Sequence, residues 1–361
     1  MNSVVHLYGS MDHGGAELRI LDCLSHLQPL DEKHYIVALS GRRGALAPLF
    51  EDLGVSIVPR ALDWGFARWF VRFLLRIRPT HVISNVQFAS GYFLFLAFLG
   101  RVPHRIAYFH STGDGKESTL ARAVFRSVGK MLIRIFSTDV VAVSEAVLAE
   151  TVESRAPMSA RCSVLYPLIP AGRFPAAAES ESTELRILVV GRLDRDKNPA
   201  RALDVVAQVR AVAGQRVVSA QFAGSGTPAE RRFLQSQAHA LGIEDCIHLL
   251  GVRDDVPLLL ASSDILLSTT LREGLPGAVL EATAAGIPCV VSSIKPNEEV
   301  ARLLPSVVTV PLGATDAVWA DVVVDLATAR RSRMAPANIR RWFEQSPFAH
   351  RDDSAVMVPW H

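Results

Sequence analysis

The chain has 361 residues, of which 49% are hydrophobic, and a formal net charge of +2. This length and composition exclude disordered and fibrous proteins and allow two hydrophobic cores of ordinary size. Its 4 cysteines are widely separated and form no C-x-x-C pair, so neither a disulfide framework nor a zinc site is predicted.

The first half of the chain alternates strands with helices. Apolar-periodic helices are predicted at 16–27 and 45–53, with further helices between the later strands. Such alternation predicts a parallel, doubly wound sheet, and hence an α/β fold. The strands are predicted at 4–8, 35–39, 55–59, 81–84, 105–109, 139–143 and 162–165.

Two positions in this half follow the ends of strands. The first strand leads to Gly14 and Gly15, which open a helix without the G-x-G-x-x-G or G-K-[ST] pattern, so dinucleotide-binding and P-loop sites are excluded there. His110 ends the strand at 105–109, on the carboxyl edge where open α/β sheets bind ligands. On the residues alone, an ordinary helix start and a structural histidine are the simpler interpretations.

Basic residues recur every four positions on two apolar helices of this half. One interpretation is a sheet-covering helix whose solvated side is cationic; the other is docking on an anionic membrane surface. A nucleic-acid partner is not predicted, because no nucleic-acid motif accompanies the charge. Residues 1–172 contain 18 Lys and Arg against 14 Asp and Glu. The two stripes are Arg68, Arg72 and Arg76, and Arg122, Arg126, Lys130 and Arg134.

The start of the chain bears on where the protein works. The N-terminal VVHLY is typical of a strand rather than a signal peptide, and no apolar run is long enough to span a bilayer. A cytoplasmic protein is predicted, with peripheral attachment to the inner face of the plasma membrane left open.

A change in composition at 167–185 predicts an interdomain linker, because prolines are followed there by small and polar residues without periodicity. We therefore expect an N-terminal domain at 1–172 and a C-terminal domain at 173–361. The second domain repeats the strand and helix alternation, with strands at 186–190, 217–222, 247–249 and 265–268.

Two loops of this domain follow predicted strands. The first, 191–198, contains Arg192 and Lys197, and its Asp194 and Asp196 spell a D-x-D pattern that is typical of metal-dependent enzymes elsewhere. The second, Gly224-Ser-Gly226, precedes a helix at 228–241. Solvated cations and a short glycine turn are the simpler interpretations of these two loops.

The stretch 273–291, EGLPGAVLEATAAGIPCVV, carries the most specific pattern of the chain. Glu273 lies on a loop broken by glycine and proline, and Glu281 lies inside the helix at 278–285 that Gly286 ends. Such a helix start offers unpaired N–H groups and the positive end of the helix dipole, which suit a diphosphate or a hydroxyl-rich ligand. The carboxylates can accept hydrogen bonds from sugar hydroxyls.

This stretch, E-G-x-P followed by E-A and A-x-G-x-P, resembles the donor-site motif of the family 4 glycosyltransferases, in particular the bacterial exopolysaccharide and lipopolysaccharide enzymes. The resemblance implies a GT-B architecture, with two Rossmann-like domains facing across a cleft. It also implies a retaining transfer from a nucleotide sugar without an obvious protein nucleophile.

The resemblance assigns roles to the residues introduced above. Glu273 is expected to contact the transferred sugar and Glu281 the ribose, while Arg192 and Lys197 grip the diphosphate, so that no metal is expected. His110 is expected to steady the reacting centre as a polar contact. The resemblance further implies that the last 20 residues or so return to the first domain. The donor-binding backbone is expected at Gly14, Gly15, Gly224, Gly226, Gly274, Leu275, Pro276 and Gly277.

The predicted activity is transfer from a UDP-sugar, or from GDP-mannose, to a glycan or lipid-linked oligosaccharide in cell-surface polysaccharide biosynthesis. Two alternatives stay open. One is a nucleotide-sugar epimerase of the same architecture, and the other is a non-catalytic sugar-nucleotide-binding partner. The sequence specifies neither the sugar, nor the linkage, nor the oligomeric state.

Overall fold

A computed structural model describes residues 2–12, 14–27, 30–112, 119–151, 161–177, 184–214, 216–329 and 334–349. The chain forms two compact units, which we call unit 1, up to Pro167, and unit 2, from Leu168. The sequence predicts this boundary between 172 and 173, a few residues after the observed one. Of the closing residues expected to return to the first domain, 342–349 lie in unit 2, and the others lie outside the described residues.

Unit 1 contains a 7-stranded sheet in the order β3-β2-β1-β4-β5-β6-β7, and all of its strand pairs are parallel. Its strands are β1 (Ser3–Tyr8), β2 (Lys33–Ala38), β3 (Ser56–Pro59), β4 (His81–Ser84), β5 (His104–Phe109), β6 (Asp139–Ala142) and β7 (Arg161–Val164). Its helices are α1 (Gly15–His26), α2 (Ala47–Asp52), α3 (Phe66–Ile77), the 3₁₀ turn η1 (Gln87–Ala89), α4 (Ser90–Leu99), α5 (Leu120–Phe136) and α6 (Glu145–Thr151).

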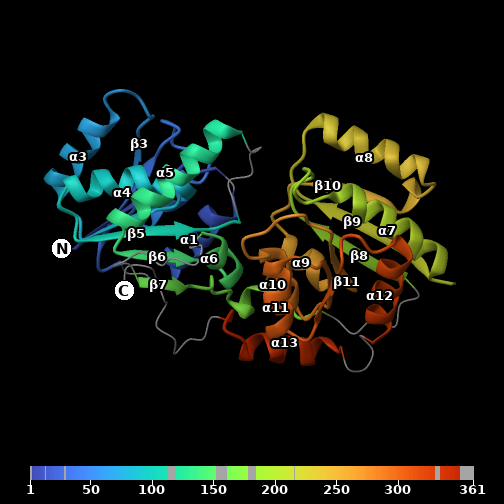
Figure 1. The fold of residues 1–361 in the computed structure, drawn as a ribbon. Helices are drawn as coiled ribbons and strands as arrows, with labels where there is room; N and C mark the ends of the chain where they lie inside the picture. Colours follow the sequence, from blue (N-terminus) through green and yellow to red (C-terminus); the bar gives the residue numbers. More distant parts are fainter. Residues whose placement is uncertain are drawn as a thin grey trace. The chain divides into compact units, whose positions relative to one another are not determined.

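The helices of unit 1 cover both faces of its sheet, as a doubly wound fold requires. On one face Leu24 of α1 and Phe50 of α2 share a buried core with Val4 and Ile36 of the central strands. On the other face α3, α4 and α5 lie side by side (Figure 1), and Phe73 of α3 packs edge-on against Tyr35 of β2 at 5.8 Å between ring centroids. The expected doubly wound sheet is confirmed for this unit.

Unit 2 contains a 6-stranded parallel sheet in the order β10-β9-β8-β11-β12-β13. Its strands are β8 (Glu184–Val190), β9 (Val217–Ala223), β10 (Ile247–Gly251), β11 (Ile265–Ser268), β12 (Cys289–Ser292) and β13 (Val307–Val310). Its helices are η2 (Ala171–Arg173), α7 (Pro199–Val212), α8 (Pro228–Ala240), η3 (Glu244–Cys246), α9 (Val256–Ala261), α10 (Gly277–Ala285), α11 (Lys295–Leu303), α12 (Asp316–Ala329) and α13 (Pro336–Gln345).

The core of unit 2 joins β8, β9 and β11 to helices α7 and α12. Trp319 of α12 and Phe222 of β9 are both fully buried in it, as is Leu203 of α7. These side chains fix the helices against the central strands and so hold the loops that follow those strands.

The segment predicted as a linker is packed against unit 2 in its first part. Ile169 is fully buried, and its N–H donates to the carbonyl oxygen of Phe348 at 2.8 Å. The N–H of Ala177 donates to Ala285 at the end of α10, at 2.9 Å. Because apolar side chains such as Phe174 occur between the prolines, this part buries surface instead of spacing the domains. The division between the units, after Pro167, falls within the segment predicted as a linker; of its residues, 168–177 pack on unit 2, and 178–183 lie outside the described residues.

Candidate active site

The strand order of each sheet reverses at one point. In unit 2 the neighbours are β8 and β11, and in unit 1 they are β1 and β4. Loops that leave such neighbouring strands diverge at the carboxyl edge, and this is where open α/β sheets bind ligands. Most of the predicted site residues lie on or next to these loops.

In unit 2 the loops after β8 and β11 are tied to each other by hydrogen bonds. The N–H of Leu271 donates to the carbonyl oxygen of Asp196 at 2.8 Å, and the Thr269 hydroxyl donates to that of Asn198 at 2.8 Å. Asn198 adopts the left-handed conformation with φ of 51° and donates its side-chain amide to Thr269 at 3.3 Å. The two loops therefore form one framework for the side chains that they carry.

The predicted cation Lys197 and the predicted carboxylate Glu273 form an ion pair between these loops, with Nζ against Oε1. The side chains are 29% and 12% exposed, so the pair is largely shielded from water. The aliphatic stem of Lys197 lies against Gly191, while its N–H donates to Asp194 Oδ1 at 3.1 Å. Opposite charges thus meet at the switch point of unit 2, where the resemblance places both the diphosphate and the sugar.

The second predicted cation, Arg192, is 64% exposed and pairs with Asp194 at 3.0 Å between Nη2 and Oδ2. Asp196 pairs with Arg272 at 3.2 Å. Both carboxylates of the D-x-D pattern are therefore engaged with guanidinium groups. In the described part of the chain, no cluster of three or more potential metal ligands is found.

Glycine is required where the ends of β8 and β9 approach each other. A Cβ atom at Gly224 would collide with the carbonyl oxygen of Gly191, and one at Gly226 would lie 2.9 Å from Cβ of Leu193. The N–H of Leu193 donates to Ser225 at 2.7 Å. The predicted glycine loop therefore packs directly on the loop that carries Arg192 and Lys197.

Helix α10 begins at Gly277 after the N-cap residue Pro276, and no side chain caps it. Amides of a first helical turn lack intrahelical acceptors and lie at the positive end of the dipole. Gly274 and Pro276 are buried, whereas Leu275, Gly277 and Glu281 are partly exposed. The helix ends at Gly286 in the left-handed conformation, with φ of 86°, as expected.

In unit 1, His110 follows β5, and its Nε2 lies 2.8 Å from Oδ1 of Asn85, which follows β4. The His110 ring stacks at a tilt on Tyr108, with 4.2 Å between centroids. Desolvation by burial lowers the pKa of His110 to about 4, so the imidazole is neutral at pH 7. When Nε2 donates to Asn85, Nδ1 is an acceptor for a hydroxyl group.

Gly14 and Gly15 begin helix α1 of unit 1. Gly14 is the N-cap, and a Cβ there would collide with the Glu17 carboxylate, which folds back over the helix start. Burial, and then the charge of Asp12, raises the pKa of Glu17. Gly15 is exposed and has open space around it. This edge thus presents a largely buried carboxylate beside two backbone positions that carry no side chain.

Several polar residues that hold these loops by hydrogen bonds were not predicted from the sequence. Asn85 holds His110, and Gln87 donates to the hydroxyl of Ser111 at 2.8 Å. Asn198 and Thr269 hold the loops of unit 2. Their common signal is position, because each lies just after a predicted strand or at the start of a helix.

Known proteins resemble this chain both in sequence and in fold. Residues 173–310 match the family model described as glycosyl transferases group 1. The chain is 29% identical over 304 residues to the capsular polysaccharide biosynthesis glycosyltransferase CapH of Staphylococcus aureus, covering 83% of this chain and 84% of the relative.

Solved structures of low sequence identity show the same fold. Anabaena Alr3699/HepE in complex with UDP and glucose superimposes with a TM-score of 0.77 at 19% identity, covering 97% of this chain and 96% of the other. WaaG, a glycosyltransferase involved in lipopolysaccharide biosynthesis, gives a TM-score of 0.67 at 13% identity, covering 96% of both chains.

These matches confirm the resemblance to family 4-like bacterial polysaccharide glycosyltransferases, and the chain has the two-domain α/β GT-B fold. They support a glycosyltransferase. Among the described residues, every helix is too short or too polar to cross a bilayer.

Proposed function

We propose that this protein transfers a sugar from a UDP-sugar to a glycan or lipid-linked oligosaccharide in bacterial cell-surface polysaccharide biosynthesis. The observation that carries the proposal is the Lys197 and Glu273 pair at the switch point of unit 2. UDP and UDP-glucose are present in the structures of Anabaena HepE, which favours a UDP-sugar over GDP-mannose. The name of CapH supports the assignment to polysaccharide biosynthesis.

In this proposal the donor replaces the internal ion pair. Lys197 turns from Glu273 to the diphosphate, which carries more negative charge than one carboxylate, and Arg192 joins it from its exposed position. Glu273 is then released to accept hydrogen bonds from the sugar hydroxyls. The amides at Gly274–Gly277 complete the phosphate site, and Glu281 accepts hydrogen bonds from the ribose.

The proposed reaction retains the configuration of the sugar. The bond from the anomeric carbon to the diphosphate breaks, and the acceptor oxygen bonds to the same face of that carbon. The acceptor proton passes to the departing phosphate oxygen. Arg192 and Lys197 stabilise the negative charge that grows on the diphosphate, so we propose that no metal is needed.

Nucleotide binding provides the first test. Calorimetry with UDP and GDP should detect preferential binding of UDP, and Lys197→Ala should weaken UDP binding by about 10- to 100-fold, because a charge-assisted contact is lost. Arg210→Ala is the matched control, since Arg210 is also ion-paired but lies in the last turn of α7, away from the carboxyl edge. Unchanged affinity in Lys197→Ala would contradict the proposed site.

Turnover provides the second test. With a suitable acceptor, the protein should release UDP and form a glycoside whose anomeric configuration, measured by NMR, matches that of the donor. Activity should persist in excess EDTA. Glu273→Gln should lower transfer by about 100-fold while UDP affinity stays close to that of the wild type. Conversion of the UDP-sugar to its epimer without an acceptor would instead indicate an epimerase, and binding without any turnover would indicate a non-catalytic partner.

A further inference from the structure

A fully exposed tryptophan lies in the loop between β3 and α3 of unit 1. Trp64 is 105% exposed, and the loop that carries it follows the carboxyl end of β3. A large apolar ring left in water gains free energy when a ligand covers it, and tryptophan is enriched at the centres of binding surfaces. We call residues 60–76, which contain this loop and most of α3, the β3–α3 corner.

Hydrogen bonds fix the loop that carries Trp64. The N–H of Gly65 donates to Oδ1 of Asp63 at 2.9 Å, and Nη2 of Arg60 donates to the same oxygen at 2.7 Å. The guanidinium of Arg60 also lies over the ring of Trp69 in α3, at 5.7 Å from the centroid. The loop is therefore ordered before any ligand binds, which lowers the entropy cost of binding.

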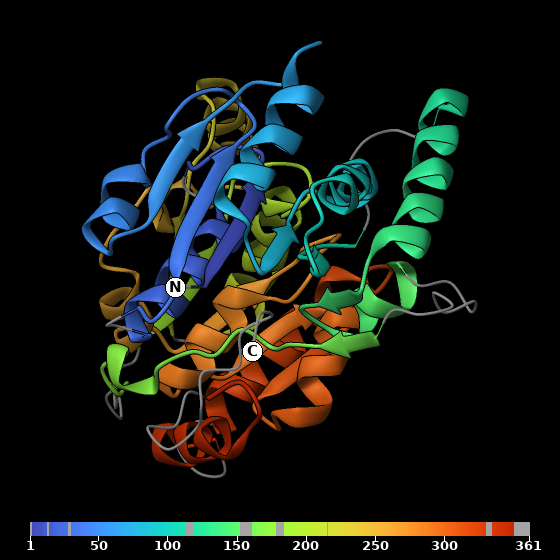
Figure 2. The ribbon, with the colours of Figure 1, turned by 90° about the vertical axis from the view of Figure 1, so that its left-hand side faces the viewer.

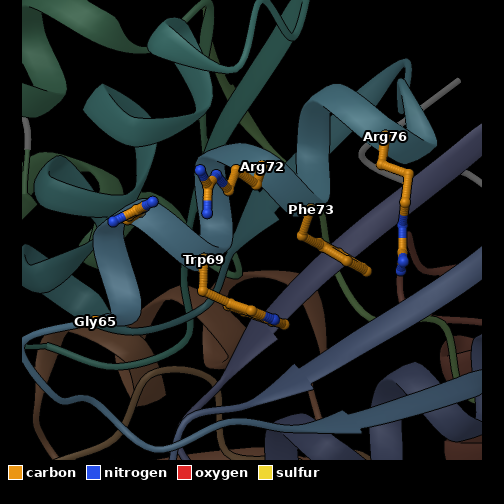
Figure 3. A pocket seen from close by; sticks show the side chains of 6 residues that line it. Gly65, Trp69, Arg72, Phe73 and Arg76 are labelled. Atoms are coloured by element: carbon orange, nitrogen blue, oxygen red, sulfur yellow. The ribbon is translucent and has the colours of Figure 1, made fainter.

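A cationic groove of about 350 Å³ begins at this loop and follows α3. Trp69 and Phe73 line it, and their rings stack at 5.2 Å (Figure 3). The other lining residues are Gly65, Arg68, Arg72 and Arg76. All three arginines are exposed, and none of them pairs with a carboxylate of the described residues. The groove thus offers guanidinium groups that can bind an anion.

The spacing of these arginines favours a polymer over a small anion. They recur every four residues, so they follow one another at about 6 Å along the helix. A small anion is held by groups that converge on it, whereas a row of charges matches a chain with one charge on each successive unit. The planar guanidinium group binds carboxylates through two parallel hydrogen bonds. No opposing charge interrupts the row, because residues 64–112 contain six arginines and no Asp or Glu.

The corner lies at the same edge of the sheet as the candidate site of unit 1. The strands are parallel, in the order β3-β2-β1-β4-β5, so the loops after β1, β3 and β5 leave from one edge. Neighbouring strands are about 4.8 Å apart, which places the loop after β3 roughly 10 Å from the loop after β1. Figure 2 shows α3 (light blue) and α5 (green) at the two ends of the helix layer, with α4 between them. A chain bound at the corner can therefore extend along the edge toward His110.

We propose that the β3–α3 corner binds an acidic glycan. Trp64 stacks on the apolar C–H face of one sugar ring, and the arginines of the groove pair with carboxylates on successive units. Within the proposed function, this glycan is the acceptor chain, held away from the sugar that is transferred. The acceptor role rests on the proposed function, whereas the binding of the glycan does not.

Two other polyanionic partners fit the corner less well. Of the large apolar side chains of α3, all of which are described, only Leu75 is exposed, so the helix lacks the aliphatic face that interfacial helices insert into a bilayer. Proteins that bind single-stranded nucleic acid stack successive bases on several rings. Of the aromatic rings at the corner, only that of Trp64 is exposed.

Calorimetry with two forms of one polymer tests the proposal. The full chain is titrated with polygalacturonate and with its methyl ester, which has the same sugar ring without the charge. The wild type should bind the acid about 10-fold more tightly than the ester, and salt should reduce this difference. Equal affinity for the two forms would overturn the proposal. Displacement of the acid by phosphatidylglycerol vesicles or by oligothymidylate at lower concentration would also overturn it.

The first variant removes the charges of the groove, by Arg68→Gln, Arg72→Gln and Arg76→Gln together. It should bind polygalacturonate no more tightly than the ester. Its matched control removes the same charge from α5, by Arg122→Gln, Arg126→Gln and Arg134→Gln together. An equal loss of affinity in both variants would overturn the proposal, since the attraction would then come from the overall charge of unit 1.

The second variant, Trp64→Ala, removes the stacking surface. It should weaken the binding of both the acid and the ester by about 10-fold, because the ring contact does not depend on charge. Phe233→Ala is the control, since Phe233 is also exposed, by 61%, but lies on α8 of unit 2. Unchanged affinity of Trp64→Ala for both polymers would overturn the proposal.

UDP titration of every variant separates this proposal from the proposed function. Variants of the β3–α3 corner should bind UDP as the wild type does, which shows that they are folded. Wild-type protein that binds UDP but does not distinguish the acid from the ester would remove this proposal alone. Wild-type protein that prefers the acid but binds no UDP would remove the proposed function, and with it the acceptor role, while the glycan site stands.

Discussion

The switch points of the two units have the same topology but different chemistry. In unit 2 the edge gathers charges, with Lys197 against Glu273 and Arg272 against Asp196. In unit 1 the corresponding edge holds a neutral imidazole, His110, bonded to the amide of Asn85. Charged groups bind phosphate, whereas neutral donors and acceptors select hydroxyl groups at lower desolvation cost. Under the proposed function, the edge of unit 2 would bind the diphosphate and that of unit 1 would bind hydroxyl groups.

The glycine contacts at these edges also differ in how far the neighbouring atoms can move when a methyl group is added. In unit 2 the glycine contact is between backbone atoms, at Gly224 and Gly191. In unit 1, Gly14 faces the flexible end of Glu17, whereas Gly44 faces the backbone of Met11. A side chain can move aside but packed backbone cannot, so substitution of Gly224 or Gly44 is expected to cost more than substitution of Gly14.

The largest expected effect is that of Gly224→Ala. The new methyl group must displace the ends of β8 and β9, so we expect a loss of about 2–3 kcal/mol in the free energy of unfolding, together with a loss of UDP affinity. Gly14→Ala in unit 1 should cost less than about 1 kcal/mol, since only the Glu17 carboxylate must shift. Urea denaturation measures both.

Gly172→Ala is the control, because nothing lies within 4 Å of the added methyl group. Equal destabilisation by Gly224→Ala and Gly14→Ala would remove the contrast between a glycine that faces backbone and one that faces a side chain.

The second largest expected effect is that the stability of unit 1 depends on pH. The pKa of His110 is lowered to about 4, below the ordinary value of about 6.5, so the unfolded chain takes up a proton first as the pH falls. The stabilisation is complete above about pH 6.5 and is lost progressively toward pH 4, by about 3 kcal/mol in total. Hydrogen exchange should therefore show unit 1 opening before unit 2 on acidification.

His110→Asn should remove part of this dependence, because the amide cannot be protonated. Burial also lowers the pKa of His6 in β1, which acts in the same direction, so some dependence should persist. An identical pH profile for His110→Asn and wild type would contradict the assignment to His110.

The smallest expected effect is that of Glu17→Gln. Burial raises the pKa of Glu17, so the ionised carboxylate opposes folding at pH 7, and the amide should raise the melting temperature slightly, within about 1 kcal/mol. If the carboxylate contacts the acceptor, transfer should fall at saturating donor while UDP affinity stays unchanged. Lower stability in Glu17→Gln would show that the carboxylate is structural.

Much of the fold was predictable, because buried parallel strands appear as short apolar runs. The strands predicted at 81–84 and 265–268 coincide with β4 and β11. Helices α11 and α12 were not predicted. The first is rich in polar residues, and in the second valine and alanine occur on nearly every side. Periodicity is weak in both, and contacts with the sheet decide their conformation.

The candidate site was predictable only in part. Residue types and spacing indicated a phosphate site near α10, but the roles of Lys197 and Glu273 came from the resemblance, and their ion pair required the structure. Asn85 and Asn198 could not be singled out, since an asparagine after a strand is common in turns. The exposure of Leu120, Val124 and Met131 on α5 could not be predicted either, because apolar residues on a helix ordinarily indicate a buried core.

The hydrogen bond from the N–H of Ile169 to the carbonyl oxygen of Phe348 joins the first residues of unit 2 to its last described turn. Arg340 of α13 strengthens this closure by donating to the carbonyl oxygens of Phe174 and Ala171, at 2.9 and 3.1 Å. A folded unit whose two ends are fastened together can be excised, transplanted or circularly permuted while its ends stay ordered. Under the proposed function, relatives could exchange this unit whole, and with it their nucleotide preference, while each recipient keeps its own acceptor.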